Sequence, residues 1–238
     1  MKRAFIITLT ILFWGCHQEK TIEGKQILSQ SMDYHDPQKS WSNTKLNIHI
    51  QEPRVLNPHR YSVLELDNSD NSFKLKRNRD EHISEHIIDK NGKSSVLLNG
   101  QIVIDTTLIN KYRLDTSRNI GYKEFYQLFY GLPMSLNDWI LEVKNTSETT
   151  FDNKDCYKVD VELKKPMFSK DWSLFISKSN KEIVGIEIAS PDKPDEGERL
   201  YFEKSITING IKIPRIRHWH ELKNNNYSGT DIIIEEIN

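Results

Sequence analysis

The sequence is poor in cysteine, in glycine and in net charge, and each scarcity excludes a class of protein. Two cysteines in 238 residues cannot form a disulfide-stapled scaffold. Ten glycines supply few phosphate-binding loops, and no Gly-x-Ser-x-Gly nucleophile motif occurs. The 33 basic and 34 acidic residues give a formal net charge of −1, which argues against nucleic acid as a partner. After Cys16 no apolar run reaches the roughly 18 residues that a transmembrane helix needs.

The N-terminus combines a basic start with an apolar run that stops at a cysteine. Residues 4–14 are too short to span a membrane, and the pattern predicts a secretory signal peptide over residues 1–15. Gly15-Cys16 resembles the lipobox of bacterial lipoproteins, in which the cysteine is acylated and becomes the new N-terminus. This resemblance implies a lipid anchor at Cys16, followed by a polar tether over residues 16–21. The alternative is an ordinary secretory signal with a chance cysteine.

Helical periodicity occurs in two parts of the chain. Residues 22–34 carry their apolar side chains on one narrow face, and Pro37 ends this helix because the residue before a proline is driven out of the helical region. Residues 107–134 are rich in aromatic side chains that recur at the spacing of a helix stripe. Gly131 and Pro133 end this second region, which we expect to hold one or two helices.

The rest of the chain alternates apolar and polar residues with a period of two, which is typical of β-strands. Asn-Gly pairs at 91–92, 99–100 and 209–210 separate such runs and predict tight hairpins. Strands do not alternate with helices, so the sequence predicts an α+β fold with one large antiparallel sheet and helices on one of its faces. The expected strands cover residues 46–50, 61–66, 73–76, 82–89, 94–98, 101–105, 139–143, 156–163, 171–177, 183–189, 199–208, 211–222 and 231–237.

Several local runs are similar to those of known envelope proteins. Residues 156–166 and 172–177 resemble the LolA- and LolB-like lipoprotein-carrier superfamily, and residues 128–134 and 34–41 resemble an uncharacterised family of Bacteroidota lipoproteins. The resemblance covers residues 22–238 and implies one domain with a half-open β-barrel. In that fold an N-terminal helix and a mid-chain helical insert cover the concave face of a curved sheet. The shared motifs are strand alternation and a few aromatic residues, so they support the fold more than an activity.

A curved sheet covered by aromatic helices offers an apolar pocket between its two layers. Burial of an acyl chain there is favourable by about 25 cal/mol per Å². The alternative is that the same residues form a filled core without a cavity. The residues expected to line the pocket are Trp41, Leu46, Ile48, Val63, Phe73 and Trp172 on the sheet, and Phe125, Leu128, Phe129, Leu132 and Met134 on the helical lid.

Four histidines are candidate metal ligands. His82 and His86 share one face of a strand about 13 Å apart, too far for one ion, so we expect them to be surface residues. His218 and His220 lie about 6–7 Å apart on one face and could reach one ion, but the sequence identifies no third ligand. We therefore expect no metal site and no cofactor.

Candidate catalytic groups are equally few. Cys156 lies in a strand pattern with no base beside it, which favours a small buried residue over a nucleophile. His35 and Asp36 could pair as a base and its carboxylate, but they also fit a helix end and a turn. We therefore expect no catalytic residue. A hydrolase would need His35, Asp36, His218 and His220 in one cleft.

Together these features predict a non-enzymatic, lipid-anchored protein of the bacterial cell envelope. Its expected ligand is a lipid or the acyl chains of a lipoprotein, bound in the pocket between sheet and helices. We expect a monomer held by its acyl anchor in the outer membrane and facing the periplasm. The alternative is an interaction or sensing module that binds a protein or glycan partner without catalysis.

Overall fold

The structure is a computed structural model and describes residues 23–237. The expected signal peptide over residues 1–15, the anchor residue Cys16 and the tether over residues 16–21 lie outside the described residues. Within residues 23–237, no helix has the length and apolar character needed to cross a membrane.

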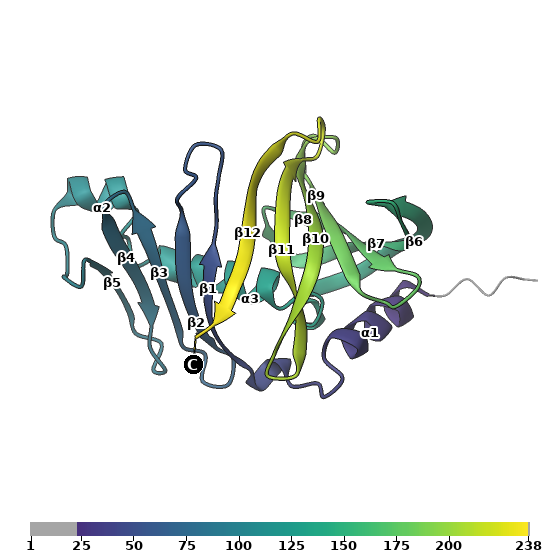
Figure 1. Cartoon of the computed structure of the whole chain (residues 1–238), viewed down its shortest axis with the longest axis horizontal. Helices are drawn as coiled ribbons and strands as arrows, with labels where there is room; N and C mark the ends of the chain where they lie inside the picture. The colour runs from purple at the N-terminus through teal and green to yellow at the C-terminus, as the bar shows by residue number, and fades with distance from the viewer. Residues whose placement is uncertain (1–22, 238) are drawn as a thin grey trace, which may run out of the picture.

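One curved antiparallel sheet dominates the described chain (Figure 1). Within residues 23–237 its 12 strands follow the order β5-β4-β3-β2-β1-β12-β11-β10-β9-β8-β7-β6. Two meanders therefore meet where β1 pairs with β12, while the edge strands β5 and β6 leave the barrel half open. The strands are β1 (Lys45–Gln51), β2 (Tyr61–Asp67), β3 (Phe73–Arg79), β4 (His82–Ile88), β5 (Ser94–Leu98), β6 (Ile140–Phe151), β7 (Lys154–Met167), β8 (Ser169–Ser177), β9 (Ile183–Ala189), β10 (Gly197–Ile208), β11 (Ile211–Glu221) and β12 (Tyr227–Glu236).

The helices pack on the concave face of this sheet. Leu28 of the first helix and Leu128 and Phe129 of the longest one share a single buried core with strand residues such as Leu174. Figure 1 shows the longest helix passing behind the central strands. The helices are α1 (Gly24–His35), the 3-10 turn η1 (Trp41–Asn43), α2 (Thr106–Tyr112), α3 (Arg118–Tyr130) and α4 (Leu136–Trp139).

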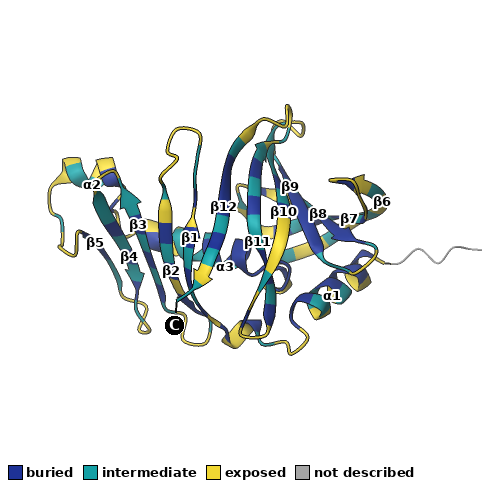
Figure 2. Ribbon diagram, in the orientation of Figure 1, coloured by how far each residue is buried: buried dark blue, intermediate teal, exposed yellow. Residues whose placement is uncertain are grey.

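Local sequence explains most of these elements. In Figure 2 buried and more exposed residues alternate along the strands, as Leu46, Ile48 and Ile50 illustrate in β1. Asn209-Gly210 joins β10 to β11 with positive φ angles of 51° and 80°, which these two residue types tolerate well. Gly131 ends α3, and a Cβ atom there would collide with the Trp41 ring. The close approach of helix and turn therefore requires glycine.

The predicted α+β fold with a half-open antiparallel sheet is confirmed. The strand expected over residues 101–105 is wrong, because Gln101 forms only an isolated bridge to Leu98. Asp105 accepts hydrogen bonds from the N–H groups of Thr107 and Leu108 and so caps α2. Residues 102–105 therefore form a loop that leads into α2 where the alternation predicted another strand.

Candidate functional site

A cavity of about 500 Å³ opens between α3 and one rim of the half-barrel. Its walls come from α3, from the segment joining α2 to α3, from the β7–β8 turn and from the rim ends of β3, β10, β11 and β12. The segment between β1 and β2 completes the wall. The volume falls in the range of about 300–1,000 Å³ that is typical of ligand sites.

One side of the cavity is aromatic. Phe125 of α3 lies nearly parallel to Trp219 of β11, with ring centroids 6.3 Å apart and an interplanar angle of 20°. Phe168, at the β7–β8 turn, packs edge-on against Trp219 and is 61% exposed. Such rings offer a large apolar surface to a ligand, and the exposed Phe168 places part of that surface at the entrance.

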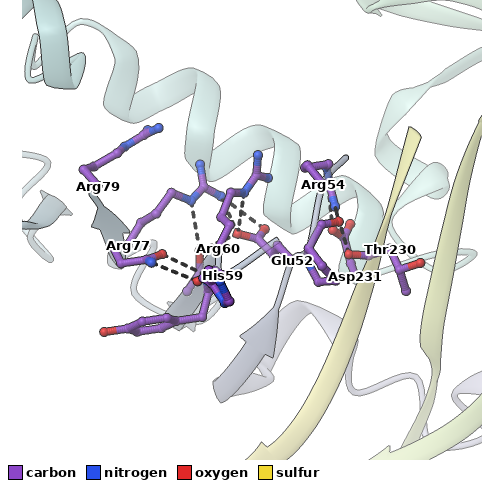
Figure 3. A network of polar contacts seen from close by, with 12 residues as sticks. Glu52, Arg54, His59, Arg60, Arg77, Arg79, Thr230 and Asp231 are labelled. Atoms are coloured by element: carbon purple, nitrogen blue, oxygen red, sulfur yellow. Dashed lines mark hydrogen bonds and ion pairs between the residues drawn. The ribbon is translucent and has the colours of Figure 1, made fainter. Parts of the chain in front are cut away.

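The other side of the cavity is lined by arginines and rests on a buried ion network (Figure 3). Glu52 accepts hydrogen bonds from Arg77 at 3.0 and 3.1 Å and from Arg60 at 3.2 Å. Ser62 donates to the same carboxylate at 2.6 Å and Tyr126 of α3 at 2.8 Å. Arg77 also donates to the hydroxyl of Tyr126. The network therefore ties α3 to the sheet.

Glu52 is ionised despite being only 1% exposed. Burial by itself raises the pKa of this carboxyl group, but the nearby Arg77 and Arg60 guanidiniums and the hydrogen bonds from Ser62 and Tyr126 lower it to about 2. Burial is the main cause that raises the pKa of the Tyr126 hydroxyl. Tyr126 therefore stays protonated and acts as a donor to Glu52.

A second buried network lies beside the first. Arg54 donates to Asp231 at 2.6 Å, and the indole of Trp219 donates to the other oxygen of the same carboxyl group at 2.7 Å. Arg217, fully buried, lies over the ring of Tyr130 with its guanidinium carbon 4.0 Å from the ring centroid. Its three guanidinium nitrogens have no hydrogen-bond partner among residues 23–237, and burial lowers its pKa.

The predicted pocket residues mostly form the core beside this cavity. Phe125 lines the cavity, while Trp41 and Met134 border a separate hollow of about 360 Å³ beside α1. The others that face inward are at most 2% exposed and belong to the main core: Leu46, Ile48, Phe73, Leu128, Phe129, Leu132 and Trp172. At these positions the filled-core alternative describes the structure.

Val63 cannot line the concave face. In β2 the alternate positions Ser62, Leu64 and Leu66 are buried, so Val63 points to the opposite, convex face. It pairs there with His49 of β1. The prediction that Val63 lines the pocket is therefore wrong. Both alternating sets of residues in β2 contain apolar side chains, so alternation alone does not identify the set that faces the core.

The prediction that His86 is a surface residue is wrong. His86 is fully buried, and its Nδ1 atom lies 2.8 Å from Oδ1 of Asn119 at the start of α3. Burial lowers its pKa to about 4.

Among residues 23–237 no three histidine, cysteine or carboxylate side chains cluster as a metal site. His218 and His220 instead contact Thr230 and the carbonyl of Asn225.

The remaining candidate groups have structural roles. His35 donates from Nδ1 to the Lys212 carbonyl at 2.7 Å and accepts at Nε2 from the Ile183 N–H at 3.1 Å, so it fixes α1 to the sheet. Asp36 accepts from the Trp41 N–H at 2.8 Å, as the helix-end interpretation predicts. Cys156 is fully buried and free, which confirms the interpretation as a small buried residue.

The arginines of the cavity are the residues that the sequence reasoning missed. They are scattered between Arg54 and Arg118, so no motif connects them. A local signal exists for Arg77, because it continues the inward-facing alternation of Phe73 and Leu75 in β3. A charged residue in the apolar register of a strand indicates a buried polar site.

Comparisons with known proteins agree with the fold. A solved structure of a putative outer membrane lipoprotein-sorting protein domain from Vibrio parahaemolyticus is similar, with a TM-score of 0.52 and 9% identity over 90% of this chain and 93% of that one. The structure of a LolA superfamily protein from Nitrosomonas europaea is also similar, with a TM-score of 0.50 and 11% identity over 90% of this chain and 93% of that one. No curated protein matches the chain in sequence.

A family model of unknown function, DUF6503, matches residues 2–236, which is nearly the whole sequence. The two similar structures agree with the architecture of this chain, in which the sheet curls without closing and helices fill it from one side. The chain therefore belongs to the DUF6503 family and has a LolA-like open-barrel fold.

Proposed function

We propose that this protein binds a hydrophobic ligand, a lipid or the acyl chains of a lipoprotein, in the cavity between α3 and the sheet. The observation that carries the proposal is the open cavity of about 500 Å³ with the aromatic wall of Phe125, Phe168 and Trp219. Most of the other predicted pocket residues are packed into the main core. The fold supports the proposal, because one similar structure is described as a lipoprotein-sorting domain.

The proposed setting is the bacterial envelope. Cleavage after residue 15 and acylation of Cys16 would leave residues 16–21 as a tether between the membrane and the domain over residues 22–238. In this proposal the protein is a monomer on the periplasmic face of the outer membrane, and it binds its ligand without catalysis. Labelling of cells with an alkyne-tagged fatty acid tests the anchor, since Cys16→Ser must abolish the label.

Binding of the neutral fluorescent probe N-phenyl-1-naphthylamine tests the ligand site. We expect saturable binding, and we expect Phe168→Ser to weaken it about fivefold, which corresponds to roughly 1 kcal/mol. Leu141→Ser on β6 is the matched control, because Leu141 is 60% exposed and Phe168 is 61% exposed. Absence of saturable binding, or equal effects of the two variants, would overturn the proposal.

A module that binds a protein partner is the second candidate, and exposed apolar loop residues favour it. Leu56 between β1 and β2 is 97% exposed, and Ile104 before α2 is 90% exposed. Neither residue lines the cavity.

A further inference from the structure

The proposed ligand site has more cationic groups than an apolar ligand requires. Its described lining holds five arginines and one carboxyl group, that of Glu198. Burial raises the pKa of Glu198, and its Oε2 atom has no hydrogen-bond partner among residues 23–237. The lining therefore holds more arginines than carboxyl groups, and its arginines are Arg54, Arg60, Arg77, Arg113 and Arg118.

Three of these arginines form ion pairs within the fold. Arg54 pairs with Asp231 at 2.6 Å, and Arg60 and Arg77 share Glu52. These ion pairs account for the three arginines without a ligand.

Arg113 and Arg118 are different. Both are exposed at the segment that joins α2 to α3, and neither forms a salt bridge with another residue of the described range 23–237. Asp115 lies between them in sequence and attracts Arg118 electrostatically, but it accepts the Ser117 N–H at 2.8 Å and forms no salt bridge with either arginine. Two guanidiniums therefore border the cavity with free donors.

Local physics disfavours an arginine at each of these positions. Arg113 adopts φ 57° and ψ 46° at the end of α2, a left-handed conformation that favours glycine or asparagine. Arg118 is the first residue of α3, where the helix dipole repels a cation, and the first turn of α3 has no acidic residue. Local backbone preference therefore does not account for an arginine at either position.

We propose that the ligand is an acidic lipid, an amphiphile whose anionic head is bound by Arg113 and Arg118. Its acyl chain packs on Phe125, Phe168 and Trp219, which lie in the same cavity. Guanidinium groups bind phosphate and carboxylate oxygens with paired, charge-assisted hydrogen bonds. This inference rests on the proposed function, since it assigns the headgroup of the same ligand.

Titrations of the purified full-length protein, followed by tryptophan fluorescence, test the inference. The probes are palmitoyl lysophosphatidylglycerol, which is anionic, palmitoyl lysophosphatidylcholine, which carries the same chain on a zwitterionic head, and glycerol 3-phosphate, which has no chain. We expect Arg113→Asn/Arg118→Gln to weaken binding of the anionic lipid about tenfold, the equivalent of roughly 1.4 kcal/mol, and to leave the zwitterionic lipid unaffected. Asparagine suits the left-handed backbone of residue 113, so the variant keeps its fold.

The matched control removes two charges elsewhere, one at a residue with positive φ and one in the first turn of a helix. Lys204 also has a positive φ, 56°, and lies on β10, while Lys25 lies in the first turn of α1. Lys204→Asn/Lys25→Gln must leave binding of the anionic lipid unchanged. An equal loss in this control, equal affinity of the wild type for the two lipids, or equally tight binding of glycerol 3-phosphate would each overturn the acidic-lipid proposal. If neither lipid binds, the proposed function itself fails.

Discussion

Replacing Arg77 by methionine is expected to lower the free energy of unfolding at pH 7 by about 3 kcal/mol. The variant leaves Glu52, which is 1% exposed, with Arg60 as its only ion-pair partner in the described chain. The Glu52 pKa, lowered from 4.5 to about 2, sets the scale, because each pKa unit corresponds to 1.36 kcal/mol. Removal of one partner of a buried ion pair typically costs about 3–5 kcal/mol.

Urea unfolding followed by tryptophan fluorescence between pH 2 and pH 7 measures this effect. Between pH 4.5 and about 2 the unfolded chain binds a proton at Glu52 that the folded protein excludes. The stabilisation is therefore complete above pH 4.5 and is lost as the pH falls toward 2. The difference between wild type and Arg77→Met is expected to shrink over the same interval.

Two further variants test whether the buried Glu52–Arg77 ion pair causes the loss of stability. Lys76→Met, on the neighbouring outward position, removes a cation that is 41% exposed and 3.9 Å from Glu85, and is expected to change stability by less than about 0.5 kcal/mol. Glu52→Gln/Arg77→Met removes both charges and is expected to recover part of the loss. The predicted role of this ion pair is refuted if Arg77→Met lowers the free energy of unfolding no more than Lys76→Met does. It is also refuted if the effects of Glu52→Gln and Arg77→Met are additive.

Two other predictions concern buried basic side chains. Arg217→Met is expected to raise the free energy of unfolding by about 1–3 kcal/mol in urea titrations, because it replaces a desolvated guanidinium that has no hydrogen-bond partner in the described chain; a loss of stability would contradict this. His86 is buried with a pKa of about 4 against 6.5 in an unfolded chain, so stability is complete above pH 6.5 and falls by about 3 kcal/mol toward pH 4. His86→Asn must flatten the pH profile of urea unfolding in that window.

The sequence predicts the architecture well because local chemistry determines most of it. Asn91-Gly92 and Asn209-Gly210 join neighbouring strands as expected, and Gly131 ends α3. The failures lie where a local pattern is ambiguous. Val63 and Leu64 are both apolar, so alternation alone could not tell which of them faces the core. Asn99-Gly100 makes a turn as expected, but the chain then leads into α2, which Asp105 caps, and not into another strand.

The site is less predictable because it depends on side chains brought together from distant segments. An aromatic lid is visible in the sequence, and Phe125 does border the cavity. The charged wall is not visible, because Glu52, Arg77 and Tyr126 approach one another only after the sheet has curled and α3 has packed on it. Charge at an inward strand position, as at Arg77, is the one local hint.

The pairing of β1 with β12 has a consequence for how the chain folds. Ile50 lies opposite Ile233, so the central seam of the sheet joins the two ends of the described chain. Each meander can form early from neighbouring hairpins, but the seam must wait until the last strand has emerged. Until then β1 presents an open edge, which is prone to pair with other chains. The half-barrel, and the cavity within it, is therefore expected to be completed as the final step of folding.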